Sequence, residues 1–539
     1  MPRTGILDKQ QERAGLSCAP GVSDLFNWYE AGMPAMERKR RGHYSTPLPL
    51  VDQILDACGY TPEADLRRVR VLDPACGSGN FLAMAARRLI ASTVGMGCSR
   101  REQAQLLERN IWGFDPDPVS CFLAKMQLSS QFAGNWHIHQ ADSLALNWAP
   151  CVDLFLANPP YLAAKNADLS GYRSALQRGQ ADSYLLFLEL AMRVVRPGGW
   201  IGLVLPDPLL ARLNAARERA QLLRQMTLQH LWHLSDVFAA EVGAVVLVAQ
   251  NVPPATTHQV AWERGHWTAS LPLLVAKAQK AETRRVAQAR LLSQPAAELR
   301  YLLSGEHGEL LDRMRAVLED TGERRLAPLG DFVTISRGEE LGRESQFIRP
   351  NTGMLDNTHR RGYAVLRGGI DMRPYTQPQA EWRIDHEAVT KPMQRYLAPK
   401  LLVVKSTDRL QATIDTRGHV ALQTLYLLHV RDCQEVQEPG DRLYFFLALL
   451  NSRLLREYVS VLHTAYKWVQ PQIEQRVLAS LPVPLIERAA RQKIIDQAKQ
   501  LERACSEGGG VVEWSEEIKA LYETLERLIR ALYLSGCGV

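Results

Sequence analysis

Short apolar segments alternate with helical segments between residues 69 and 249, and this alternation constrains the fold more than any other feature. Each apolar segment is short and rich in β-branched or aromatic residues, which is typical of a buried strand. We predict seven strands, at residues 70–72, 111–114, 137–140, 152–157, 200–205, 230–234 and 242–249. A repeated strand–helix–strand order indicates βαβ units, so the expected fold class is α/β, with a largely parallel sheet covered by helices.

The length of the chain and its changes in composition predict several domains. A chain of 539 residues exceeds what one hydrophobic core usually supports. Polar helical segments follow the α/β part, glycine and β-forming residues return near Leu326, and an apolar helical stripe marks the C-terminal end. The predicted divisions are an N-terminal lead-in at 1–41, an α/β domain at 42–255, a helical linker at 256–325, a mixed α+β domain at 326–485 and a C-terminal helical hairpin at 486–539.

The overall composition permits a polyanionic partner and argues against a metal site or a membrane span. The net charge of +6 and the isoelectric point of about 8.8 are mildly basic. The nine cysteines form no Cys-x-x-Cys pair and no cysteine–histidine cluster at zinc spacing, so we expect free thiols in a reducing cytoplasm and no metal. The N-terminus is charged, and no apolar run approaches the roughly 18 residues that a membrane span needs.

Three acidic residues stand at successive predicted strand ends. Asp73 precedes the tight turn 77–79 and a helix, where glycine lets the backbone approach a ligand and the helix N-terminus offers free N–H groups. Asp115 can accept both hydroxyls of a ribose, and Asp142 can accept from an adenine amino group. The series therefore predicts a nucleoside site, and the alternative is that the three acids only cap helices. An NAD enzyme is disfavoured, because "DPACGSGNF" departs from the Gly-x-Gly-x-x-Gly pattern.

The predicted strand at 152–157 runs directly into Asn158-Pro159-Pro160-Tyr161. An exocyclic amine has two N–H donors, which the Asn158 side-chain oxygen and the Pro159 carbonyl can accept together. Those two bonds draw the nitrogen lone pair out of ring conjugation and make the amine a nucleophile, while Tyr161 stacks on the base. Such a site works by positioning and electrostatics and needs no general base.

These motifs and their order resemble the gamma class of N6-adenine DNA methyltransferases, the TaqI type. The motifs that carry the resemblance are "GHYSTP", "VLDPACGSGNFL", "GFDPDP", "HQADSL", "LANPPYL" and "LSDVFAAEVGAVVLV", followed by "LGDFVTISRG", "YAVLRGGIDMRPY", "YLAPKLLVVKSTDRLQATID" and "FFLALLNSRLLREYV". The resemblance implies a Rossmann-like methyltransferase sheet, then a mixed α+β target-recognition domain and C-terminal helices. The implied activity is transfer of a methyl group to N6 of a flipped-out adenine in duplex DNA, within restriction-modification or a related defence system.

The resemblance also implies the cofactor, the partners and the roles of individual residues. The cofactor would be S-adenosylmethionine, bound by Thr46, Asp73, Ala75, Gly77, Gly79, Asp115 and Asp142. The catalytic residues would be Asn158, Pro159, Pro160 and Tyr161, with Phe238 as a second aromatic group against the target base. For Phe238 the alternative is a core residue that seals its loop. The partner would be duplex DNA, bound by a monomer, and the resemblance leaves open a separate restriction endonuclease.

Two other functions remain compatible with the same motifs. One is a methyltransferase that acts on RNA or on a protein amide, because glutamine methyltransferases acting on protein release factors share the tetrapeptide. The predicted second domain favours DNA over that alternative. The other is a DNA-recognition subunit of a restriction complex without catalysis, which the intact tetrapeptide and acidic series disfavour, since a binding subunit has no need for nucleophile-activating geometry.

Four further segments receive weaker interpretations. Asp24 with "ERK" at 37–39 imitates a nuclease pattern, but forty residues are too few for a nuclease domain. The basic run at 37–42 is a solvated face or a phosphate contact. The segment 164–184 is expected to be a mobile loop over the substrate. In the second domain, His463, Tyr466, Lys467 and Trp468 contact DNA or pack under the final helices.

Overall fold

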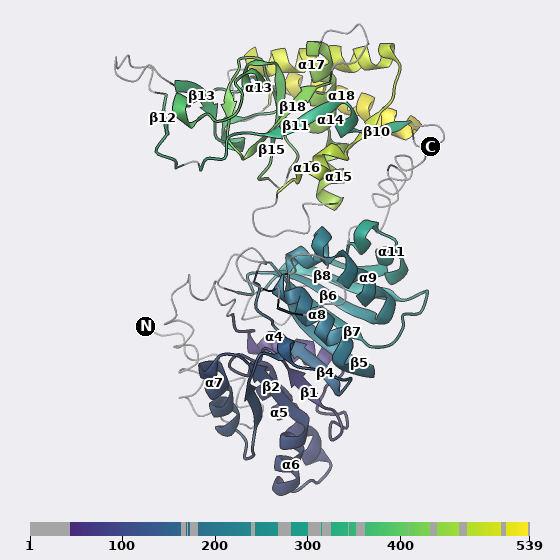
Figure 1. Ribbon diagram of the computed structural model, residues 1–539. Coiled ribbons are helices and arrows are strands. Elements are labelled where there is room, and N and C mark those ends of the chain that lie inside the picture. Colours follow the sequence, from purple (N-terminus) through teal and green to yellow (C-terminus); the bar gives the residue numbers. More distant parts are fainter. Residues whose placement is uncertain are drawn as a thin grey trace. The chain divides into compact units, whose positions relative to one another are not determined.

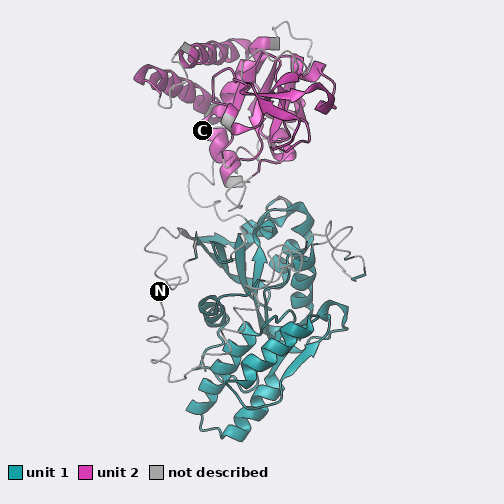
Figure 2. Cartoon of the chain, turned by 90° about the vertical axis from the view of Figure 1, so that its left-hand side faces the viewer, with its two compact units in different colours: residues 1–301 teal, residues 302–539 magenta. Residues whose placement is uncertain are grey.

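A computed structural model gives the arrangement of the chain (Figure 1). It describes residues 44–162, 169, 171–172, 182–238, 243–267, 282–299, 314, 325–342, 344–351, 362–407, 409–431, 439–462, 472–507 and 514–536. The chain divides into two compact units, residues 1–301 and 302–539, which Figure 2 shows in different colours. The predictions for 1–41 and for 463–468 fall outside the described residues, as does nearly all of 163–181.

The first unit contains one large mixed sheet. Its strand order is β3-β2-β1-β4-β5-β7-β6-β8-β9. The strands are β1 Val71–Asp73, β2 Ile111–Asp115, β3 His137–Gln140, β4 Val152–Ala157, β5 Val195–Pro206, β6 Thr227–Ser235, β7 Ala244–Gln250, β8 Gln259–His266 and β9 Glu282–Ala287. Neighbours pair in parallel, except that β7 is antiparallel to β5 and β6 and β9 is antiparallel to β8. The predicted α/β class and the seven predicted strands are confirmed.

Helices cover both faces of this sheet, which explains why its central strands are almost continuously apolar. The helices are α4 Leu48–Ala57, α5 Asn80–Gly95, α6 Arg100–Asn110, α7 Pro118–Ser129, α8 Ser183–Val194 and α9 Ala216–Gln225. Helices α4, α5 and α7 share one core with Val246 and Val248 of β7. Helices α8 and α9 contact each other and reach β5 and β6. The intervening residues Val245 and Leu247 are buried as well.

The prediction of a helical linker at 256–325 is wrong for its first part, because β8 and β9 extend the sheet there. Strand β8 pairs in parallel with β6, and its alternate residues Val260 and Trp262 are buried. Strand β9 is the last strand of the sheet and pairs with β8 alone, so charged residues such as Arg285 are tolerated along it. The composition of this edge strand is as polar as that of a surface helix, and for this reason the segment was predicted to be helical.

The second unit combines small sheets with helices around two buried clusters. One sheet has the order β11-β18-β15-β16 and another β12-β14-β13-β17, while β10 pairs with β19. The strands are β10 Leu326–Pro328, β11 Val333–Arg337, β12 Ile348–Pro350, β13 Gly362–Leu366, β14 Trp382–Asp385, β15 Lys400–Val404, β16 Ala412–Asp415, β17 Val420–Ala421, β18 Leu425–Val430 and β19 Pro482–Pro484. Four longer helices are α14 Pro439–Asn451, α15 Arg453–Leu462, α17 Arg488–Glu507 and α18 Glu516–Gly536.

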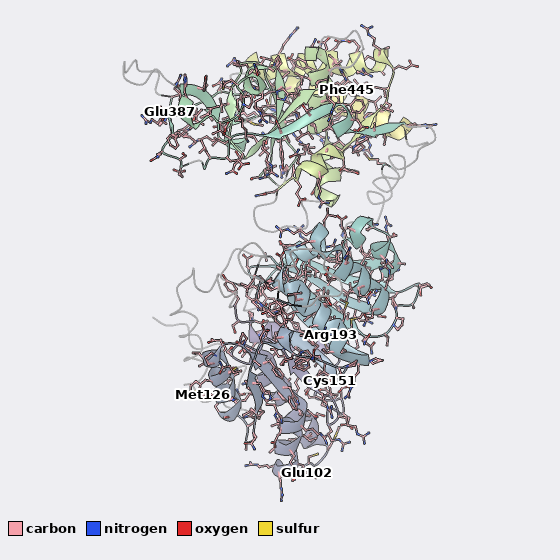
Figure 3. The ribbon with its side chains drawn as sticks, in the orientation of Figure 1. Glu102, Met126, Cys151, Arg193, Glu387 and Phe445 are labelled. Atoms are coloured by element: carbon pink, nitrogen blue, oxygen red, sulfur yellow. The ribbon has the colours of Figure 1, made fainter. Side chains whose placement is uncertain are left out.

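The C-terminal helices belong to the core of this second unit. Leu525 and Ile529 of α18 lie in the same buried cluster as Leu401 of β15 and Phe445 of α14. Figure 3 shows Phe445 within the packed part of the unit, while Glu387 lies at its surface. The apolar stripe predicted from the sequence of the last helix therefore faces the second unit, and the mixed α+β architecture with C-terminal helices is confirmed.

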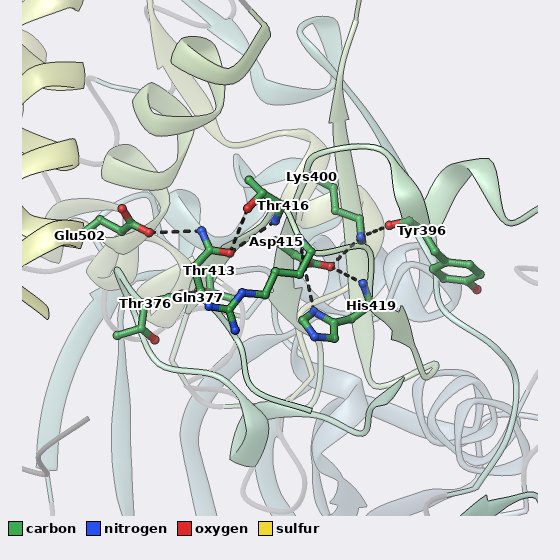
Figure 4. Close-up of polar contacts among 10 residues, drawn as sticks. Thr376, Gln377, Tyr396, Lys400, Thr413, Asp415, Thr416, His419 and Glu502 are labelled. Carbon is green, nitrogen blue, oxygen red and sulfur yellow. Dashed lines mark hydrogen bonds and ion pairs between the residues drawn. The ribbon is translucent and has the colours of Figure 1, made fainter. Parts of the chain in front are cut away.

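A buried ionic group stabilises the sheet of β15 and β16 (Figure 4). Lys400 and Asp415 are direct cross-strand partners, both fully buried, with their charged atoms 2.7 Å apart. The second Asp415 oxygen lies 3.0 Å from Nδ1 of His419, and the Lys400 ammonium also donates to the Tyr396 carbonyl. Burial alone would raise the pKa of Asp415, but the His419 hydrogen bond and the Lys400 charge outweigh it and hold that pKa at about 2. Removing either Lys400 or Asp415 would leave the other charge buried without a counter-charge, so we interpret this group as structural.

Candidate active site

The carboxyl ends of four neighbouring parallel strands meet at one edge of the large sheet. Asp73 ends β1, Asp115 ends β2, Asp142 follows β3 by two residues, and Asn158 directly follows β4. Because the strand order here is β3-β2-β1-β4, these four side chains lie along the same edge. A cavity of about 550 Å³ opens there, and all four residues line it.

The cavity contains most of the predicted site residues. Those that line it are Thr46, Asp73, Ala75, Gly77, Asp115, Asp142, Asn158 and Pro160. Gly79, Pro159, Tyr161 and Phe238 are not among its lining residues. Gly79 begins helix α5, and the other three lie at or beside the end of β4, so the site has a cofactor-sized cavity and an adjoining aromatic group.

The turn at 77–79 has positive φ angles at both glycines and is hydrogen-bonded to the end of β2. Gly77 and Gly79 have φ values of 49° and 91°, which favour glycine. A Cβ atom at Gly79 would also lie 3.1 Å from the Cβ atom of Ala124. The backbone N–H of Gly77 donates to Oδ2 of Asp115 at 3.0 Å, so β2 holds the turn in place.

Burial raises the pKa values of two of the acids. Asp73 is 1% exposed and accepts from the Ala75 N–H, and burial moves its pKa well above the ordinary value. Burial also raises the pKa of Asp115 to about 6, against the opposing effect of hydrogen bonds from the Asp117 and Gly77 N–H groups. A ligand that donates hydrogen bonds to these carboxylates would favour their ionised forms.

The three acids do more than cap helices. Helix α7 is capped by Asp117, which accepts from the Val119 and Ser120 N–H groups, and not by Asp115. Asp142 does accept from the Leu144 N–H at the start of a short 3₁₀ turn, as the capping alternative predicts. Asp142 nevertheless lines the cavity, so capping this turn does not remove it from the candidate site.

The buried hydroxyl of Thr46 indicates whether the cavity suits a nucleoside cofactor that carries an amino acid group. Its hydroxyl oxygen is buried and has no hydrogen-bond partner among the described residues, although the side chain lines the cavity. Its carbonyl accepts from Nδ2 of Asn80 at 2.9 Å, which fixes the backbone. A buried hydroxyl without a partner is costly, so a polar ligand group at this position would satisfy it.

The amide of Asn158 has a defined orientation. Its Nδ2 donates to the Tyr44 carbonyl at 2.7 Å, and because a carbonyl can only accept, the amide nitrogen must face Tyr44. The side-chain oxygen Oδ1 therefore remains the acceptor for a ligand. The Pro160 carbonyl accepts from the Ser183 hydroxyl, and Ser183 Oγ in turn accepts from the Leu162 N–H at 2.9 Å.

Two aromatic rings, those of Phe238 and Tyr44, lie near the ring of Tyr161 in the tetrapeptide. The Tyr161 hydroxyl donates to the Val204 carbonyl at 3.2 Å, which holds the ring against β5. The rings of Tyr161 and Phe238 meet edge to face with centroids 6.5 Å apart, and Phe238 lies 5.9 Å from the ring of Tyr44. Phe238 is half-buried and also packs against the core of the first unit.

Tyr44, Tyr172 and Ser183 are among the cavity-lining residues that sequence reasoning missed. Tyr44 stands two positions before Thr46 within "GHYSTP", so its proximity to a predicted cofactor residue was an available signal. Ser183 begins α8, and its short polar side chain at a helix start was a second signal. Tyr172 lies in the segment predicted to be a mobile loop, where the sequence gives no contact partner.

A Rossmann-like sheet with antiparallel β7, and with acids at the ends of its first three strands, defines a nucleoside-cofactor methyltransferase fold. Residues 22–260 match the family described as N-6 DNA Methylase, and residues 360–483 match the TaqI-like C-terminal specificity domain. The chain therefore belongs to the N-6 DNA methylases that carry a TaqI-like specificity domain, as the motifs predict. S-adenosyl-L-methionine is the cofactor that this family implies.

Comparison with individual proteins agrees with this family. The chain is 27% identical over 216 residues to the type II methyltransferase M.XhoI of Xanthomonas vasicola, a match covering 37% of this chain and 40% of that protein. It is 25% identical over 209 residues to M.VspI of Vibrio sp. (strain 343), covering 37% and 45%. The matches thus span less than half the length of these two relatives.

A solved structure with the same fold is that of the type IIL restriction-modification enzyme MmeI in complex with DNA. The TM-score is 0.60 at 11% identity, over 93% of this chain and 77% of that one, and at this identity the likeness concerns the fold alone. Among the described residues, no helix is both long and apolar enough to cross a bilayer.

Proposed function

We propose that this chain transfers a methyl group from S-adenosyl-L-methionine to N6 of an adenine that is flipped out of duplex DNA. The observation that carries the proposal is the orientation of the Asn158 amide, whose nitrogen is bound to the Tyr44 carbonyl. That bond leaves an oxygen acceptor at the edge of a cavity lined by Asp73, Asp115 and Asp142. An amine substrate, rather than a carbonyl substrate, suits such an acceptor.

The tetrapeptide would activate the substrate amine by accepting both of its N–H bonds. Asn158 Oδ1 takes one, and we assign the other to the Pro159 carbonyl, since the Pro160 carbonyl is engaged by Ser183. With both hydrogens held, the nitrogen lone pair turns out of conjugation with the ring and becomes the nucleophile. The amine is positively charged after methylation and releases its proton to solvent, so the site needs no separate base.

The cavity residues would hold the cofactor, which supplies a methyl group on a positively charged sulfur. We assign the ribose hydroxyls to Asp115 and the adenine amino group to Asp142. The Thr46 hydroxyl would hydrogen-bond to a polar group in the amino acid portion of the cofactor. Asp73 would bind a positively charged group of the same portion. Ala75, Gly77 and Gly79 bring the backbone and the start of α5 close to the ligand.

Duplex DNA is the substrate that the second unit favours over RNA or a protein amide. Its TaqI-like specificity domain spans 360–483. Within that unit Arg349 of β12 and Arg383 of β14 are direct cross-strand partners, and both side chains are exposed. The Asp385 carboxylate lies 3.6 Å from Arg349 and compensates for part of this like charge. Both guanidinium groups remain exposed, so a phosphate near them would compensate for the rest. We assign the chain to the cytoplasm, where it would act as a monomer, and a separate restriction endonuclease would be its partner in a defence system.

Expression in a methylation-deficient bacterium, followed by sequencing of genomic DNA with base-modification detection, tests this function. We expect N6-methyladenine in one short sequence motif. Purified protein should then transfer labelled methyl groups to a duplex containing that motif, and not to RNA or to protein. Genomic DNA without modified adenine, despite folded protein that binds the cofactor, would contradict the proposal.

Replacing Arg349 and Arg383 together with alanine should weaken DNA binding without changing the cofactor affinity. If each contacts a phosphate, the slope of log affinity against log salt should fall by about 1 to 2. The measurement is fluorescence anisotropy of a labelled duplex from low to physiological salt. The matched control is Arg527→Ala with Arg530→Ala, which removes the same charge from the exposed face of α18. Equal slopes in the two double variants would exclude the β12–β14 pair from the DNA interface.

Replacing Phe238 with alanine should lower the methylation rate about tenfold, because one stacking contact to a base is worth roughly 1 to 3 kcal/mol. The melting temperature and the cofactor affinity should stay close to those of the unchanged protein. A 2-aminopurine at the target position should change its fluorescence, since the extruded base is held less firmly. Phe132→Ala, a half-buried phenylalanine of the same core, is the control. A large loss of melting temperature with a normal rate per folded molecule would return Phe238 to a purely structural role.

A further inference from the structure

Tyr172 lies against the acid that we assign to the cofactor's adenine. It follows the tetrapeptide by eleven positions, and both it and Leu169 line the cavity. The Tyr172 hydroxyl donates to Oδ2 of Asp142 at 2.5 Å. Tyr172 thus lies on the side of the cavity that contains Asp142.

The Asp142 carboxylate is held by two donors, one on each oxygen. Oδ1 accepts from the Leu144 N–H at 3.0 Å, and Oδ2 accepts from Tyr172. Each carboxylate oxygen has two lone pairs, so each can still accept one further donor beside its protein bond. Two anchors also fix the rotation of the carboxylate, which a single anchor would not.

We propose that Tyr172 is a positioning residue for cofactor recognition, whose hydroxyl holds the Asp142 carboxylate in the orientation that accepts from the amino group of the cofactor's adenine. This inference rests on the proposed role of Asp142. It adds a residue outside the motifs named above, located downstream of Asn158 in the chain.

The protonation state of Tyr172 agrees with this role. Burial and the bond to Asp142 raise the pKa of Tyr172 to about 12, so the hydroxyl stays protonated and able to donate at neutral pH. A phenylalanine at this position keeps the ring and removes only the donor. Tyr172→Phe therefore isolates the hydrogen bond from the packing of the side chain.

Calorimetric titration of the full chain with two ligands tests the inference. S-adenosylhomocysteine carries the amino group, whereas S-inosylhomocysteine carries an oxygen there, which a carboxylate disfavours. Tyr172→Phe should bind S-adenosylhomocysteine about three- to tenfold more weakly, as expected for one lost hydrogen bond. The preference for it over S-inosylhomocysteine should fall in the same variant, because a purely structural loss would weaken both ligands equally.

Two further variants make the outcome decisive. In an Asp142→Ala background, the additional change Tyr172→Phe should have no effect on affinity, since Tyr172 acts through Asp142. Tyr60→Phe removes a hydroxyl bonded to the Ala85 carbonyl outside the cavity and should leave both affinities unchanged. If Asp142→Ala itself leaves affinity and preference intact, the cofactor assignment fails. A different outcome overturns only the inference about Tyr172. In that outcome Asp142→Ala weakens cofactor binding, whereas Tyr172→Phe leaves the affinity unchanged or increases it.

Discussion

Asn158→Ala should lower the rate of methyl transfer by about 10³-fold, the scale seen when one preorganised electrostatic contact to a reacting group is removed. The substrate amine would lose the acceptor that holds its lone pair out of conjugation. The cofactor affinity should change little, because Asp115 and Asp142 remain in the cavity. Single-turnover transfer of labelled methyl groups to a duplex, with calorimetric titration of the cofactor alongside, measures the two quantities separately.

Asn158→Asp provides the informative comparison for that result. Aspartate keeps an acceptor oxygen but cannot donate to the Tyr44 carbonyl, so the group would lose its fixed orientation and lie close to another acceptor. We expect a rate between those of the unchanged protein and Asn158→Ala. If folded Asn158→Ala methylates at a near-normal rate, the Asn158 amide does not activate the substrate amine. Positioning of the two substrates would then be the remaining source of catalysis.

The parts of the site that could be predicted from sequence are those fixed by local chain chemistry. Asp73, Asp115 and Asn158 each end or follow a strand, and a parallel sheet brings such ends together whatever the details of packing. Gly77 and Gly79 are required by their positive φ angles within a turn only a few residues long.

The parts that could not be predicted depend on contacts between distant segments. The bond from Asn158 to Tyr44 joins residues 114 positions apart, and that from Tyr172 to Asp142 joins residues 30 apart. Nothing in the composition of either segment specifies its partner. Strand β9 was missed for a related reason. Its edge position tolerates charged residues, and only its pairing with β8 makes the segment a strand.

Asp115→Ala should weaken cofactor binding by about 2 to 4 kcal/mol, because a charged acceptor for two hydroxyl donors is lost. The measurement is calorimetric titration with S-adenosylhomocysteine. Because Asp115 also accepts from Gly77 and Asp117 N–H groups, the variant could loosen the turn as well. Asp115→Asn, which keeps a neutral acceptor, separates these effects and should lose less. Unchanged affinity in both variants would exclude Asp115 from the site.

The pKa of Asp115 gives this prediction a pH dependence with a definite sign. In the free protein its pKa is about 6, raised by burial, so the carboxyl is largely protonated below that pH. Hydroxyl donors favour the ionised form, which lowers the pKa on binding and releases a proton. Affinity should therefore be highest above about pH 7 and fall by up to about tenfold for each pH unit below 6.

Titrations between pH 5 and 8, in buffers of different ionisation enthalpy, would detect that proton directly. The pKa of Asp73 is also raised, by burial and by the neighbouring charge of Asp115. Asp73 remains in Asp115→Asn, so the difference between the two proteins reports the ionisation of Asp115 together with its effect on Asp73. We expect the variant to bind with a shallower pH profile and to release less proton near pH 6. Identical profiles would mean that the ribose hydroxyls are bound elsewhere, and that Asp115 serves only to hold the glycine turn through Gly77.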